Sequence, residues 1–106
     1  MLRLMIVDDE QIIREALSSM IDYTSLGYEV IATAKNGMEA YDRIRDDYPD
    51  VVITDIKMPI LNGLELIERA SHIDSRITFI LLSGYGEFEY AKQAMKYGVR
   101  YYLLKP

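Results

Sequence analysis

The sequence contains no cysteine and no tryptophan, and it has a single histidine, three prolines and six glycines. The absence of Cys excludes disulfides, thiolate catalysis and Cys-ligated metal sites. A single imidazole excludes multi-histidine metal centres and argues against a Ser/His/Asp arrangement. We interpret His72, which follows a run of helical periodicity among polar residues, as a solvated surface group.

Long apolar runs are also missing, because none approaches the ~20 residues of a membrane span and the N-terminus has no signal-peptide pattern. We therefore expect a cytoplasmic protein that does not enter a membrane. The 106 residues fit one domain, residues 1–106. Acids outnumber bases by 17 to 12, for a net charge of −5, which disfavours nucleic-acid binding by this segment.

Hydrophobic periodicity divides the chain into alternating strands and helices. Strands are predicted at residues 3–7, 28–34, 51–54, 77–82 and 101–104, and helices at 10–22, 36–46, 64–70 and 88–98. Asn36 is a plausible N-cap, Gly98 a helix stop, and residues 56–63 read as a loop. This alternation predicts an α/β domain with a mainly parallel sheet and right-handed crossovers.

Polar side chains follow four of these strands, namely Asp8 and Asp9, Asp55, Ser83, and Lys105. Sites in open parallel sheets form beyond the carboxyl ends of the strands. Three carboxylates in one pocket raise each other's pKa unless a cation offsets them, and oxygen ligands suit Mg²⁺. A carboxylate nucleophile, Mg²⁺, an ammonium and a hydroxyl are what in-line phosphoryl transfer to an aspartate requires.

Each of these residues also has a simpler interpretation, because an isolated Asp or Ser at a strand end is usually a helix cap or a turn residue. Their occurrence together favours a functional site, since the acidic, hydroxyl and ammonium groups that phosphoryl transfer requires all follow strands at the same edge of the sheet. Pro106 follows Lys105 directly, and a constrained or cis peptide bond there would aim the ammonium inward.

Four motifs, in order and spanning the whole chain, resemble the receiver (response-regulator) domain of bacterial two-component signalling. They are Val7-Asp8-Asp9-Glu10, Thr54-Asp55-Ile56-Lys57-Met58-Pro59 with Asn62-Gly63, Leu82-Ser83-Gly84, and Tyr102-Leu103-Leu104-Lys105-Pro106. The resemblance implies a flavodoxin-like (CheY-like), doubly wound, five-stranded parallel sheet with strand order 2-1-3-4-5.

The resemblance also implies the role of each site residue. Asp55 is the phospho-acceptor and also a Mg²⁺ ligand, Asp9 is a direct ligand, Asp8 is a ligand through water, and the Lys57 backbone carbonyl completes the metal site. Ser83 follows the phosphoryl group, Lys105 pairs with it, and Tyr102 is an aromatic rotamer switch. Lys57 and Tyr85 occupy the two variable positions that tune autodephosphorylation.

The implied function is a phosphorylation-driven switch and not an enzyme, beyond its own phosphoryl transfer and autodephosphorylation. A sensor histidine kinase is the expected donor. The segment Ser83 to Ala91 further resembles receivers that precede an AraC-type DNA-binding domain, so any contact with DNA is expected only through an output domain absent from this chain.

One departure from the family is that receivers continue past Lys-Pro into a fifth helix, and this chain stops at Pro106. We expect apolar side chains on one face of the first and fifth strands to be exposed. At ~25 cal/mol per Å², a few hundred Å² would remove several kcal/mol from a stability of ~5–15 kcal/mol. We therefore expect marginal stability or a homodimer, formed through that face or through the fourth helix and fifth strand, where Tyr90, Tyr97 and Tyr101 cluster.

Three other functions remain as hypotheses. An aspartyl-phosphate phosphohydrolase needs a general acid two residues after the nucleophile, where this chain has Lys57. A nucleotide or flavin carrier is disfavoured because no Gly-x-Gly-x-x-Gly or Walker-type run follows the first strand. A pseudo-receiver that only binds a partner would not need the complete acidic pocket.

Overall fold

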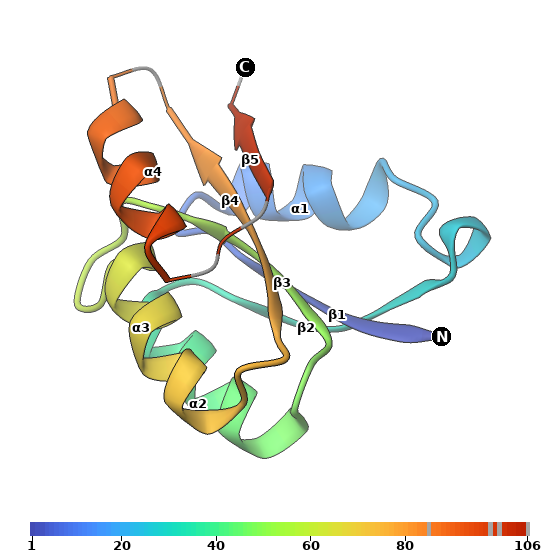
Figure 1. The fold of residues 1–106 in the computed structure, drawn as a ribbon. Coiled ribbons are helices and arrows are strands. Elements are labelled where there is room, and N and C mark those ends of the chain that lie inside the picture. Colours follow the sequence, from blue (N-terminus) through green and yellow to red (C-terminus); the bar gives the residue numbers. More distant parts are fainter. Residues whose placement is uncertain (85, 98, 100, 106) are drawn as a thin grey trace.

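The computed structural model describes residues 1–84, 86–97, 99 and 101–105, and within them five strands alternate with four α-helices (Figure 1). The elements in chain order are β1 (Leu2–Val7), α1 (Gln11–Ser19), the 3₁₀ turn η1 (Thr24–Leu26), β2 (Tyr28–Ala34), α2 (Gly37–Asp47), β3 (Val51–Asp55), α3 (Gly63–Ile73), β4 (Thr78–Ser83), α4 (Phe88–Met95) and β5 (Tyr101–Leu104). All strand pairs are parallel, in the order β2-β1-β3-β4-β5. The predicted fold class and strand order are confirmed.

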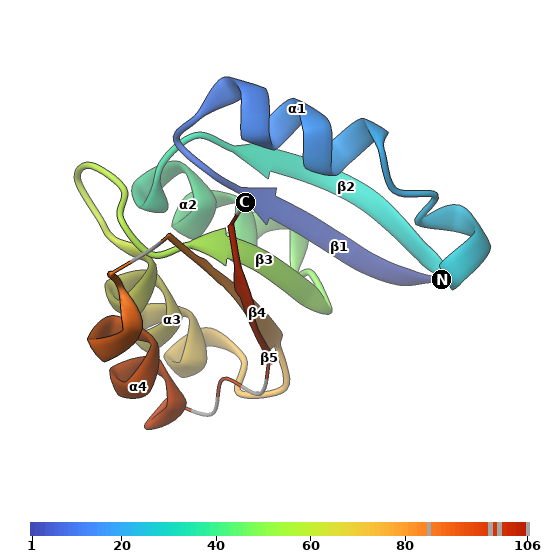
Figure 2. The ribbon, with the colours of Figure 1, turned by 90° about the horizontal axis from the view of Figure 1, so that it is seen from above.

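The helices form unequal layers on the two faces of the sheet, with α1 on one face and α2, α3 and α4 on the other (Figure 2). Side chains of a strand alternate between faces, so each strand supplies both layers. Met5, Val7, Val52 and Leu81 point into the larger core beneath α2, α3 and α4. A smaller core under α1 is built from Leu4, Ile6, Tyr23, Val51, Ile53 and Leu82.

Helix boundaries differ from the sequence prediction at several places, and two of these differences have a clear physical cause. The first helix ends at Ser19 and not at residue 22, although Met20 and Ile21 continue the apolar periodicity. Both of those side chains are exposed, whereas Tyr23 is buried and its hydroxyl donates to the Leu17 carbonyl at 2.6 Å. Burying Tyr23 turns the chain out of the helix and into η1, so tertiary packing overrides the local pattern there.

The second difference lies at the start of α3, within the segment predicted as a loop. Asn62 caps this helix: its side chain accepts from the Glu65 N–H, and the Glu65 carboxylate accepts from the Asn62 N–H. This capping box satisfies two backbone donors, as the predicted Asn36 cap of α2 does for one. The helix stop predicted at Gly98 lies outside the described residues, and α4 ends at Met95.

The α1 face of the sheet is covered unevenly. Toward β5, the side chains of Tyr101 and Leu103 are both 55 % exposed, and Leu2 at the start of β1 is also exposed. A cavity of about 450 Å³ lies over this area, lined by Leu2, Tyr28, Val51, Thr78, Ile80 and Tyr101. Within the described residues, no helix has the length and apolar character required to cross a membrane.

Candidate functional site

The site is assembled at the edge of the sheet where the parallel strands end. β3 is central and its last residue is Asp55, while Asp8 follows β1 on one side and Ser83 ends β4 on the other. Lys105 follows β5, and its N–H donates to the Ser83 carbonyl at 2.8 Å, which fixes its backbone beside β4. Residues separated by up to 97 positions in the sequence therefore share one pocket because the strand order brings their ends together.

A lysine ammonium lies between two buried carboxylates. Lys105 Nζ is 2.9 Å from Asp55 Oδ2 and 2.9 Å from Asp8 Oδ2, and it is 3.6 Å from Glu10 Oε1. Asp8 and Asp55 are both buried, so their charges interact more strongly than surface charges do. The arrangement places one ammonium among three carboxylates, so the carboxylates outnumber the cation in the pocket.

Burial and charge shift the titration of this cluster. Burial of the Asp55 carboxyl and, to a smaller extent, the nearby Asp8 charge raise its pKa to about 6, although the hydrogen bond from Lys105 lowers it. Burial alone would lower the pKa of Lys105, but the hydrogen bonds and charges of Asp8 and Asp55 outweigh it, so that pKa is raised. The lysine stays protonated, whereas Asp55 changes its charge close to neutral pH.

The loop after β1 offers oxygen atoms suited to a divalent cation. One carboxylate oxygen each from Asp8, Asp9 and Glu10 lies within 4.8 Å of the others. Asp8 is held in place, because its Oδ1 accepts from the Glu10 N–H at 2.9 Å and its carbonyl accepts from Arg14 Nη1 at 2.7 Å. Clustered carboxylates with an exposed outer member fit the preference of Mg²⁺ for oxygen ligands and retained waters.

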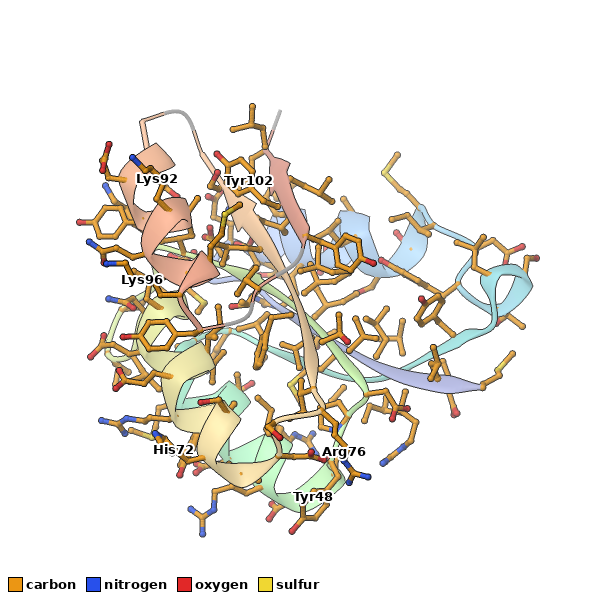
Figure 3. The ribbon with its side chains drawn as sticks, in the orientation of Figure 1. Tyr48, His72, Arg76, Lys92, Lys96 and Tyr102 are labelled. Atoms are coloured by element: carbon orange, nitrogen blue, oxygen red, sulfur yellow. The ribbon has the colours of Figure 1, made fainter. Side chains whose placement is uncertain are left out.

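Two further predicted residues lie on the β4–β5 side of the pocket. Ser83 is fully buried, and within the described residues its hydroxyl has no hydrogen-bond partner. Tyr102 is half-buried and packs against the larger core, on the face of β5 toward α4 (Figure 3). His72, by contrast, is exposed near the end of α3, away from the strand ends, as its interpretation as a surface group requires (Figure 3).

The loop between β3 and α3 approaches the site closely. A Cβ on Gly63 would lie 2.2 Å from the Asp55 carbonyl oxygen, so only glycine lets α3 begin there. Ile60 has φ 73° and is 76 % exposed, and the Leu61 N–H donates to the Pro59 carbonyl across it at 2.8 Å. This three-residue γ-turn is a strained conformation for a β-branched residue.

A pocket of about 380 Å³ opens beside this loop, lined by Asp9, Ile56, Lys57, Met58, Pro59, Asn62 and Tyr90. The Lys57 side chain is exposed, and its Nζ stands 5.8 Å from the centre of the Tyr90 ring. The role assigned to the Lys57 backbone carbonyl stays a prediction.

The structure thus brings Asp8, Asp55 and Lys105 into contact and sets Asp9 and Ser83 at the same rim. Tyr85 and the Lys105–Pro106 peptide bond, for which a cis form was considered, lie outside the described residues. Glu10, Arg14 and Tyr90 also belong to the surroundings of the site, a role that their sequence positions did not predict. Only the adjacency of Glu10 to two aspartates was a signal in the sequence.

Glu87 was missed as well. Its carboxylate accepts the Gly84 N–H at 3.1 Å, next to Ser83. The contact joins the residue at the N-cap position of α4, whose side chain makes no capping hydrogen bond, to the residue that follows β4.

Comparisons with known proteins agree with this architecture. Residues 4–106 match the model of the response regulator receiver domain family. An uncharacterized transcriptional regulatory protein named YesN from Bacillus subtilis is 52 % identical over the whole chain, which spans only 29 % of that protein.

Solved structures give the same result. The receiver domain of AraT, a response regulator from Geobacillus stearothermophilus, aligns with a TM-score of 0.94 at 39 % identity, over 99 % of this chain and 81 % of that one. A two-component transcriptional regulator AraC from Clostridium phytofermentans aligns with a TM-score of 0.92 at 34 % identity, over 100 % and 82 %. The predicted resemblance, including that to AraC-type regulators, is confirmed.

Proposed function

This chain belongs to the response regulator receiver domain family, and from that premise we propose that Asp55 accepts a phosphoryl group in the presence of Mg²⁺ and so switches the conformation of the domain. The observation that carries the proposal is the contact of one ammonium, Lys105, with the buried carboxylates of Asp8 and Asp55 at 2.9 Å each. A charged cluster held at the edge of a well-packed sheet is costly to maintain, which favours a functional role.

The chemistry follows from the residues at the rim. A carboxylate oxygen of Asp55 attacks the phosphorus of a phosphohistidine, a P–O bond forms, the P–N bond breaks, and its electron pair stays on the imidazole nitrogen. Asp8 and Asp9, with the Lys57 carbonyl, would hold Mg²⁺, which supplies positive charge to the phosphoryl oxygens. Lys105 then pairs with the acyl phosphate, and the Ser83 hydroxyl donates to it.

The switch rests on the elements next to Ser83 and Lys105. Phosphorylation replaces the single negative charge of the Asp55 carboxylate with an acyl phosphate of about −1.5 to −2 charge units, which draws the hydroxyl and the ammonium toward it. Tyr102 lies on β5, next to the strand that ends at Ser83, and packs against the larger core, so its ring is positioned to respond. The resulting population shift over α4 and β5 would change how the domain contacts its partners, and the acyl phosphate would then be lost by autodephosphorylation.

The partners are proposed on the same basis. The donor is a sensor histidine kinase in the cytoplasm, and the output is transcriptional, through an AraC-type DNA-binding domain. A homodimer would form through α4 and β5, or through the exposed side chains over the α1 face. Support for this comes from the exposed apolar side chains of Met95, Tyr97, Tyr101 and Leu103 on these elements.

The experiment is incubation of the chain with Mg²⁺ and acetyl phosphate, followed by intact-mass spectrometry. We expect one phosphoryl adduct, lost in Asp55→Asn and retained in Asp46→Asn, which makes the same change at an exposed aspartate on α2. Adduct formation should also fall when Mg²⁺ is chelated. An unmodified wild-type chain that is folded by circular dichroism would contradict the proposal and favour a pseudo-receiver.

A further inference from the structure

The pocket beside the acidic site is bridged by a cation and an aromatic ring from two different elements. Lys57 comes from the loop after β3, two residues beyond Asp55, and Tyr90 comes from the first turn of α4. The Lys57 Nζ stands 5.8 Å from the Tyr90 ring centre, within the ~6 Å range of a cation–π interaction. Both residues line the same pocket, together with Asp9, Met58 and Asn62.

Neither partner has a stronger alternative. No carboxylate lies within ion-pair distance of the Lys57 ammonium, and no hydrogen bond is formed by the Tyr90 hydroxyl, in the part of the chain that the structure describes. The Tyr90 ring is 40 % exposed. Each therefore depends on the other for a specific contact across the pocket.

We infer that the contact between Lys57 and Tyr90 is a resting-state latch, which ties the loop after β3 to α4 and opens when Asp55 is phosphorylated. The inference rests on the proposed function, because it needs the phosphoryl group at Asp55. An ammonium on a flexible four-carbon stem can turn from a ring quadrupole to a nearby dianion, and the charge–charge attraction is the stronger of the two.

The consequence is a direct path from the acceptor to α4 that does not pass through Ser83 or Tyr102. When Lys57 leaves the ring, the first turn of α4 loses this contact with the loop. By linkage, a contact present only in the resting state opposes phosphoryl binding by the free energy that the contact contributes. Removing Tyr90 in advance should therefore tighten the binding of a phosphoryl analogue.

The test measures the affinity of the chain for beryllofluoride, a phosphoryl analogue, at saturating Mg²⁺. Tyr90→Leu removes the ring and keeps a good helix former, and we expect it to bind beryllofluoride about two- to fivefold more tightly. Tyr90→Phe keeps the ring and should bind as wild type does. Lys57→Met removes the cation, so adding Tyr90→Leu to that variant should have no further effect.

A spectroscopic readout checks the same contact without relying on affinity. In the resting chain, the ε-methylene protons of Lys57 should be shifted upfield by the Tyr90 ring current, and this shift should disappear in Tyr90→Leu. It should also disappear in the wild type when beryllofluoride and Mg²⁺ are added. Asp55→Asn should keep the upfield shift under those conditions, because it cannot form the adduct.

The outcomes separate the latch from the proposed function. Wild-type binding with no tightening in Tyr90→Leu, or the same tightening in the Lys57→Met background, would overturn the latch and leave phosphorylation at Asp55 intact. Absence of beryllofluoride binding in every variant would overturn the proposed function itself, and with it the release of Lys57. A twofold or larger tightening that requires Lys57 would support the latch.

Discussion

β3 ends at Asp55 and β5 leads directly into Lys105, the two charged partners of one contact, yet the two strands are built in opposite ways. β3 lies between β1 and β4 and is buried along its whole length, and Asp55 is its last residue. β5 pairs with β4, and its side chains at Tyr101, Leu103 and Leu104 are exposed. The Lys105 ammonium is thus carried by a strand with little buried apolar area.

The difference in burial indicates that β3 and β5 have different roles in the switch. Regions with few buried apolar contacts open at low free-energy cost, and densely packed strands do not. The acceptor carboxylate is held on a strand that cannot easily move, whereas its cation is held on one that can. A switch needs both properties, because the phosphoryl group must be placed reliably and something must then respond to it.

The largest effect on stability is expected from Gly63→Ala, which disturbs the packing of α3 against the end of β3. The new Cβ would lie 2.2 Å from the Asp55 carbonyl oxygen, a backbone atom that cannot turn aside, so α3 has to shift from β3. We expect a loss of about 3 kcal/mol in the free energy of unfolding, measured by urea denaturation.

Gly84→Ala is the matched control for that substitution. The nearest atom to its Cβ is the flexible Glu87 carboxylate at 3.3 Å, so the loss should stay below about 1 kcal/mol. Equal losses of unfolding free energy in the two variants would show that the close approach of Gly63 to β3 does not limit stability.

A paired truncation compares the two strands directly. Val52 in β3 is fully buried and Leu103 in β5 is 55 % exposed. Val52→Ala should lower the free energy of unfolding by about 2 kcal/mol, from lost burial and the cavity left behind, and Leu103→Ala by less than about 0.5 kcal/mol. A cost at Leu103 equal to that at Val52 would mean that β5 is as firmly packed as β3.

Ionisation of Asp55 should make stability depend on pH. Its pKa is raised to about 6 from 3.8, so between these values the folded chain binds more protons than the unfolded one. Stability from this group is present below about pH 4 and is lost as the pH rises through 6, by on the order of 1–3 kcal/mol.

Asp55→Asn should remove that pH dependence. Without Mg²⁺, the variant should be more stable than the wild type at pH 7.5, with a difference that shrinks toward pH 4, as measured by thermal unfolding across that range. A constant difference at every pH would contradict a raised pKa for this carboxyl.

The smallest effect is expected at Ile60, in the loop that follows β3. Its φ of 73° is costly for a β-branched residue, and its side chain is mostly exposed. Ile60→Gly should raise the free energy of unfolding by about 0.5–1 kcal/mol, because relief of strain exceeds the entropy lost by glycine. A decrease, measured by the same denaturation, would indicate that the exposed side chain packs in solution.

Much of this arrangement was predictable because it follows from local patterns. Apolar β-branched runs located β3 and its neighbours, and a parallel sheet places the residues after its strands, Asp8, Asp55 and Lys105, at one edge. The order of the strands followed from the family resemblance and not from local patterns. The Asn36 cap was also predictable from residue type. These features depend on residue type and spacing, which the sequence displays directly.

The features that escaped prediction depend on long-range packing. The α1 periodicity continues through Met20 and Ile21, but burial of Tyr23 ends the helix earlier. The cap of α3 is an exception, because Asn62 and Glu65 stand three residues apart in a capping-box pattern that the sequence displays, and the Asn62-Gly63 turn signal was given more weight than that pattern. The contact of Lys57 with Tyr90 joins residues 33 positions apart on elements whose spacing the sequence does not reveal.

Hydrogen exchange with and without beryllofluoride and Mg²⁺ tests the contrast between β3 and β5 most directly. The account predicts that amide exchange in β3 stays slow and unchanged, whereas exchange in β5 and in the first turn of α4 changes when the analogue binds, and that Asp55→Asn abolishes the change. Equal changes in β3 and β5, or a change confined to β3, would contradict the claim that the acceptor strand is fixed and the cation strand responds.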